Sequence, residues 1–232
     1  MPAKPVHVSP TFPPIAALWI LAGTLISIFA ATLVAHRLEF RHNWEGVIVV
    51  YAVLFGSMTL WAWALSQSLG SGSLVRDFGF RLKGEDIGWG TLALVGAMIG
   101  RVVVVLVLPD ETRNPMRDVD RAFRLDHSAL IAFSVAALVG APLIEELVFR
   151  GVLQRALTRF IGAPIAIVAQ GFLFAAYHFV PSTGLFTVLY FLSLALFGVA
   201  AGIAAEYTGR LGPGMIAHML NNALAVLILF KI

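Results

Sequence analysis

The sequence predicts an all-α protein that crosses a membrane several times, and three observations support this prediction. Of the 232 residues, 59% are hydrophobic and only 12% are charged, whereas soluble domains carry roughly 25% charged residues. Several apolar runs reach the length of about 20 residues that a helix needs to cross the hydrocarbon core. These runs are continuous rather than alternating, which favours a bundle of transmembrane helices over a β-barrel.

We count about seven spans, and six to eight are compatible with the pattern. The Pro-rich residues 1–13 predict a flexible tail, and the amphipathic segment 74–86 is expected to lie at the membrane interface. We expect a single membrane domain with N-terminal spans and connectors over residues 14–127 and a helical core over 128–232. The predicted spans are residues 14–36, 46–68, 87–108, 127–160, 164–179, 185–207 and 214–230.

Composition also limits the chemistry and the partners. The chain has no cysteine, which excludes disulfides, thiol catalysis and Cys-ligated metals. Its net charge is +3, and its 16 Lys and Arg residues are distributed among short loops between the apolar runs. This distribution suits a membrane surface better than nucleic acid. We therefore expect contact with membrane lipid and no nucleic-acid partner.

Charged side chains inside membrane spans are costly, so they are the first places to look for function. Glu145 and Glu146 are adjacent, and on a helix they point about 100° apart. Glu146 and Arg150 are spaced i,i+4, which predicts an ion pair on one helical face. Glu145 is then the carboxylate left free to act as a general base. An equally good interpretation is a charged group that closes the end of a span, with the arginine reaching the interface.

A histidine in the next span is placed to meet this carboxylate. Glu145 and His178 each lie about 16 residues from the turn at Ile161 and Gly162. An antiparallel hairpin with about 1.5 Å of rise per residue brings both side chains to a similar depth. A hydrogen-bonded histidine at a helix end is the simpler alternative for His178.

The last span carries His218 and Asn222, again spaced i,i+4 and hence on one face. Both side chains are donors that can stabilise an oxyanion, but hydrogen bonding between helices explains them as well. Straight helices would leave His218 nearer the opposite membrane face from His178. This conflict requires tilted helices, a projecting hairpin over 150–163, or a break within 181–213. Gly198 and Gly202 form a G-x-x-x-G pattern, which predicts close helix packing.

Taken together, Glu-Glu-x-x-x-Arg at 145–150, Phe-x-x-x-His at 174–178 and His-x-x-x-Asn at 218–222 resemble the CAAX protease and bacteriocin-processing family. This family includes type II CAAX prenyl endopeptidases. The resemblance covers about residues 128–231, so the core over 128–232 is expected to be the catalytic one. It implies a multi-pass protein of the bacterial cell membrane.

The resemblance also implies roles for single residues. Glu145 would activate water, His178 would orient it, and His218 with Asn222 would stabilise the oxyanion. Glu146 and Arg150 would support the site. The substrate would be a peptide or protein at the membrane, with lipid-modified ones among the candidates, and no cofactor would be needed.

Two alternatives remain open at this stage. Two histidines and a glutamate can ligate zinc, so a zinc-dependent intramembrane protease would use the same pocket. The chain contains no H-E-x-x-H motif, and zinc would leave Asn222 without an obvious role. The second alternative is a non-catalytic membrane protein that serves immunity, scaffolding or transport.

Overall fold

The computed structural model describes residues 12–37, 43–107, 127–178 and 185–230, and every regular element in these ranges is a helix. The expected tail over 1–13 falls almost wholly outside the described residues. The elements are α1 (Ile15–Arg37), α2 (Trp44–Leu69), α3 (Leu74–Phe78), α4 (Asp86–Val107), α6 (His127–Val135), η1 (Ala136–Gly140), α7 (Ala141–Glu146), η2 (Leu147–Gln154), α8 (Arg155–Ile161), α9 (Ala163–Tyr177), α10 (Leu185–Thr208) and α11 (Gly212–Phe230).

Each predicted span corresponds to a helix or to a continuous helical run. Within the described residues, five helices are long and apolar enough to cross a membrane: α1, α2, α4, the run from α6 to α8, and α10. Helix α9 is apolar but has only 15 residues, and α11 has 19. The predicted count of about seven spans is therefore approximate, while the all-α, multi-pass fold is confirmed.

Local sequence explains where several helices begin and end. Asn43 caps α2 by accepting a hydrogen bond from the backbone N–H of Gly46 at 3.0 Å. Gly162 adopts a φ of 81° between α8 and α9, a conformation that glycine adopts without a steric penalty. Pro164 then lies in the first turn of α9, as the sequence predicts.

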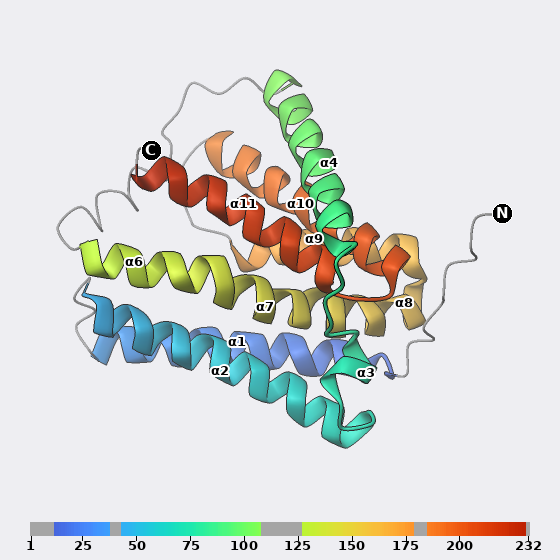
Figure 1. Cartoon of the computed structure of the whole chain (residues 1–232). Helices are drawn as coiled ribbons and strands as arrows, with labels where there is room; N and C mark the ends of the chain where they lie inside the picture. The colour runs from blue at the N-terminus through green and yellow to red at the C-terminus, as the bar shows by residue number, and fades with distance from the viewer. Residues whose placement is uncertain (1–11, 38–42, 108–126, 179–184, 231–232) are drawn as a thin grey trace.

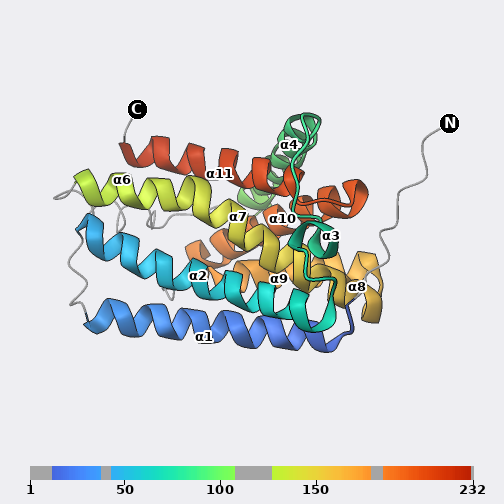
Figure 2. The same cartoon turned by 60° about the horizontal axis from the view of Figure 1, so that its bottom comes forward.

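The helices form a bundle whose central member is the long run from α6 to α8. Helices α1 and α2 lie side by side along one flank of this run (Figure 1; Figure 2). Helices α9, α10 and α11 lie along its other flank, and α4 crosses α10 and α11 at a steep angle (Figure 1). Every residue of η2 is buried, so this segment is the core of the bundle.

Candidate active site

The two glutamates lie in a stretch where the long helix changes its winding. They end α7, which is preceded by the π-helical segment η1 and followed by the π-helical segment η2. In η1 the N–H of Ala141 donates to the carbonyl of Ala136, five residues back. The same register would pair the carbonyl of Ala137 with residue 142, which is Pro142 and has no N–H. This register therefore leaves the Ala137 carbonyl, two turns before the glutamates, without a backbone donor at residue 142.

Glu146 and Arg150 form the ion pair that their spacing predicts. Arg150 Nη1 donates to Glu146 Oε1 at 2.7 Å, and both side chains are fully buried. Arg150 Nη2 also donates to the carbonyl of Gly198 in α10 at 3.3 Å. The guanidinium carbon lies 4.5 Å from the centre of the Phe174 ring, a cation–π contact. The pair therefore joins the central helix to α9 and α10.

Glu145 is 3% exposed and faces two imidazole rings. Its Oε2 atom lies 3.3 Å from His178 Nε2 and 3.7 Å from His218 Nε2. The first distance is short enough for a hydrogen bond, but Glu145 Oε2 has no hydrogen-bond partner among the described residues. The structure thus brings Glu145, His178 and His218 together, and it places Glu145 at the meeting point of three helical elements.

The second nitrogen of each ring has its own acceptor. His178 Nδ1 lies 2.9 Å from the carbonyl oxygen of Phe174, and His218 Nδ1 lies 3.2 Å from Glu146 Oε1. Both partners accept hydrogen bonds, so we assign a proton to each Nδ1. In the neutral rings, the Nε2 atoms that face Glu145 then carry a lone pair and no proton. A contact with an ionised Glu145 therefore requires an additional proton, which the carboxylate and the imidazoles can share.

Asn222 lies one turn beyond His218 on α11 and makes a different contact. Its Nδ2 donates to the carbonyl of Ala137 at 2.8 Å, which is the carbonyl that Pro142 leaves without a backbone donor. Asn221 Nδ2 lies 3.3 Å from Asn222 Oδ1. Asn222 is thus held in place on both sides of its amide, and one of its two N–H bonds is left for another acceptor.

His218 reaches the site because the hairpin of α8 and α9 projects past the start of α11. A Cβ built on Gly151 would lie 3.3 Å from Leu211 Cδ1, so α11 begins beside the middle of η2. The turn at Gly162 is eleven residues beyond Gly151, or roughly 16 Å along a helix. His218 follows Leu211 by seven residues and Glu145 precedes Gly151 by six, so both lie at a similar depth.

A polar stripe that is not among the predicted site residues continues from the site along the central helix. Gln154 Nε2 donates to the carbonyl of Gly202 at 3.0 Å and contacts Glu206 Oε2 at 3.3 Å. Gln154 Oε1 and Thr158 Oγ1 are buried without a hydrogen-bond partner among the described residues. Both residues continue the i,i+4 series that starts at Glu146 and Arg150, and this spacing was a signal available in the sequence.

Glu145, His178 and His218 are also the set that could ligate a metal ion. Within the part of the chain that the structure describes, no group of three or more His, Asp or Glu side chains has the arrangement of a metal site. The zinc alternative therefore depends on movement of these side chains.

Comparison with known proteins finds one family model that matches the segment carrying this site. The family model for type II CAAX prenyl endopeptidase Rce1-like proteins matches residues 127–224. No curated protein and no solved structure matches the chain. The matched segment contains all six candidate residues from Glu145 to Asn222, and at the family level it indicates a CAAX-type intramembrane protease. Residues 127–224 of this multi-pass membrane protein are therefore similar to the Rce1-like family of type II CAAX prenyl endopeptidases.

Proposed function

We propose that this protein is an intramembrane endopeptidase in which Glu145 activates the water that hydrolyses a peptide bond. The observation that supports this proposal best is the buried Glu145 carboxylate, which lies within 3.3 Å of His178 and 3.7 Å of His218. An ionised carboxylate beside neutral imidazoles can accept a proton from water, and the neighbouring ring can then share that proton.

The proposed reaction uses each residue at a stated atom. Glu145 takes a proton from water, and the hydroxide oxygen bonds to the carbonyl carbon of the scissile peptide. His178, whose ring is oriented by the Phe174 carbonyl, positions this water through Nε2. The tetrahedral intermediate then collapses as the C–N bond breaks, and the proton held by Glu145 and His178 passes to the leaving nitrogen.

The oxyanion of the intermediate would be stabilised by His218 and Asn222. Asn222 keeps one N–H beyond the one that it donates to Ala137. His218 donates from Nε2 only when that atom is protonated, because Glu146 occupies its Nδ1 side. Arg150 supports this arrangement by holding Glu146 in place.

The substrate in this proposal is a membrane-associated protein or peptide, and the family description makes a prenylated C-terminal peptide the first one to test. We would reconstitute the full chain in nanodiscs and measure the cleavage of a fluorogenic peptide with and without a farnesyl group. Glu145→Gln keeps the shape of the side chain and removes the base, so kcat should fall about 100-fold or more. Glu206→Gln makes the same change outside the site and should leave kcat within about twofold.

Three outcomes would contradict parts of this proposal. Cleavage by Glu145→Gln at the rate of the unmodified protein would remove Glu145 from the chemistry. Loss of activity with a chelator, together with one zinc bound per chain, would favour the zinc mechanism. Biological activity that survives Glu145→Gln would favour a non-catalytic membrane protein.

A further inference from the structure

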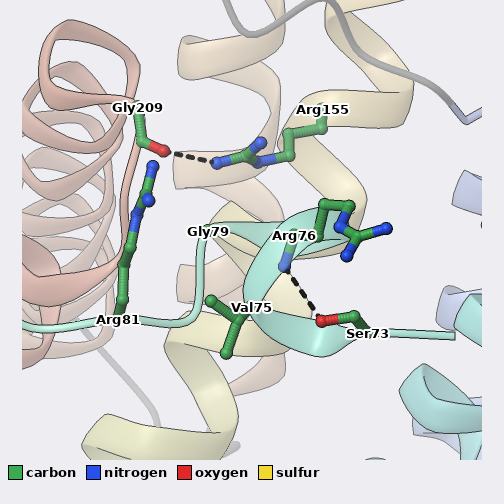
Figure 3. Close-up of a pocket in the computed structure, with 7 residues that line it drawn as sticks. All are labelled: Ser73, Val75, Arg76, Gly79, Arg81, Arg155 and Gly209. Carbon is green, nitrogen blue, oxygen red and sulfur yellow. Dashed lines mark hydrogen bonds between the residues drawn. The ribbon is translucent and has the colours of Figure 1, made fainter. Parts of the chain in front are cut away.

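A cationic cavity lies at the end of the bundle where the chain begins α4 and α11. Its volume is about 410 Å³, and its lining includes the side chains of Arg76, Arg81 and Arg155 and the backbone of Gly79 and Gly209. Figure 3 shows Arg81 and Arg155 approaching Gly209 from two sides, while the Arg76 side chain leaves α3 and extends away from these three residues. Arg155 Nη2 donates to the carbonyl of Gly209 at 3.1 Å, which joins the central helix to the turn between α10 and α11.

The carboxylates along the chain near this cavity are bound to other groups. Asp77 accepts hydrogen bonds from Ser66 Oγ at 2.6 Å and from Ser71 Oγ at 2.7 Å. Burial raises the pKa of Asp77, but these hydrogen bonds outweigh it, so the pKa is lower than usual and the group is ionised at neutral pH. Its charge is directed at the two serines and not into the cavity.

Arg210 takes up the next two acids. It pairs with Asp86 at 2.6 Å and with Glu85 at 2.5 Å, and Lys83 lies 3.9 Å from the same Glu85. Glu206, in α10, attracts the Arg155 guanidinium electrostatically and also accepts a hydrogen bond from Gln154.

By contrast, Arg76 and Arg81 have no ion-pair partner within the described residues, and both are exposed.

The position of the cavity in the bundle indicates which kind of anion can balance the charge of its arginines. Helix α2 ends, α4 begins and α10 ends at this end of the bundle (Figure 1). Because these helices have the length and composition of membrane spans, we expect the cavity to lie at the edge of the membrane. Val75 lines it and is 50% exposed, and Leu82 and Ile87 nearby along the chain are 59% and 62% exposed. Cations beside exposed apolar side chains match the two parts of a lipid, its charged headgroup and its acyl chains.

We propose that this cavity binds the phosphate of an anionic membrane lipid, with Arg81 contacting the phosphate oxygens and the exposed side chain of Arg76 turning toward them. Arg155 contributes charge and holds the Gly209 turn that forms one wall. A guanidinium presents several N–H donors in one plane, and this geometry suits phosphate oxygens. The site is independent of the proposed peptidase activity because none of its residues belongs to the Glu145 site.

The test compares two pairs of substitutions that remove the same charge. Arg76→Gln with Arg81→Gln changes the cavity, whereas Lys83→Gln with Arg37→Gln removes two cations that do not line it. Binding of phosphatidylglycerol, phosphatidylcholine and inorganic phosphate to the full chain in neutral detergent would be measured by native mass spectrometry. Helical circular dichroism would verify that each variant is folded.

We expect the cavity pair to bind phosphatidylglycerol about 25-fold more weakly, at about fivefold per arginine, and the control pair to bind it like the unmodified protein. Equal weakening in both pairs would show an effect of net charge alone and overturn the proposal. Equal binding of phosphatidylcholine would also overturn it. Binding of inorganic phosphate without binding of phosphatidylglycerol would overturn the lipid as the source of the phosphate.

Discussion

The α1–α2 hairpin and the region from α6 to α11 both bond hydroxyl groups within single helices, but the second region also bonds polar side chains between its helices. In the hairpin, Thr24, Ser27 and Thr59 each donate to the carbonyl four residues back in their own helix. In the second region, Gln170 Nε2 donates to the carbonyl of Gly198, and Gln154 Nε2 to that of Gly202, both in α10. Bonds within one helix leave it free to pack by shape, whereas bonds between helices fix the position of one helix against another.

The two regions also differ in how they pack and in which of them holds the candidate site. The hairpin packs through small residues, since a Cβ on Gly23 would overlap the ring of Trp61. Gly198 packs as closely against Gly171, which confirms the prediction of close packing from G-x-x-x-G. Its carbonyl also accepts hydrogen bonds from Arg150 and Gln170. The region with bonds between helices is also the region that the family model matches.

The largest effect on stability is expected at Arg150. Arg150→Met leaves the buried carboxylate of Glu146 with only His218 beside it, so the free energy of unfolding in mixed micelles should fall by about 3–5 kcal/mol. The double variant Glu146→Leu/Arg150→Met should recover most of this loss, because no buried charge remains unpaired. Arg37→Met, at an exposed helix end, should change the unfolding free energy by less than about 0.5 kcal/mol. A double variant as unstable as Arg150→Met would show that the ion pair is not the cause.

A smaller effect on stability, with a separate effect on activity, is expected at Asn222. Asn222→Ala removes the donor to the Ala137 carbonyl and should lower the free energy of unfolding by about 1 kcal/mol. Pro142→Ala restores a backbone N–H that can donate to this carbonyl, so in that background Asn222→Ala should cost less.

Activity distinguishes the two roles of Asn222. If its second N–H stabilises the oxyanion, kcat should fall about 100-fold in both backgrounds, whatever the stability. A kcat that recovers together with stability in the Pro142→Ala background would assign Asn222 a purely positioning role.

The smallest effect is expected in the α1–α2 hairpin. Ser27→Ala removes a hydrogen bond within one helix, which adds little because the carbonyl keeps its helical partner. The free energy of unfolding should change by less than about 0.5 kcal/mol, and kcat should change by less than about twofold. A loss as large as that of Asn222→Ala would remove the distinction between the two regions.

Much of the site was predictable because its spacing is local. The Glu146–Arg150 pair follows from a separation of four residues on one helix. The approach of Glu145 to His178 follows from their equal distances to one turn. Gln154 and Thr158 were missed although their spacing continues the same series, since an uncharged polar residue carries a weaker signal than a charged one in an apolar helix.

The sequence by itself determined the helical membrane fold, the helices that carry the candidate site and the pairing of Glu146 with Arg150. Apolar length, turn residues and helical periodicity are sufficient for these because each acts within one or two adjacent elements. Only the tertiary structure decided how His218 reaches Glu145 and why Asn222 faces Ala137. The depth of His218 depends on the level at which α11 begins beside η2. The contact of Asn222 depends on the Ala137 carbonyl, which Pro142 leaves without a backbone donor. These are relations between elements far apart in the chain, which no local pattern encodes.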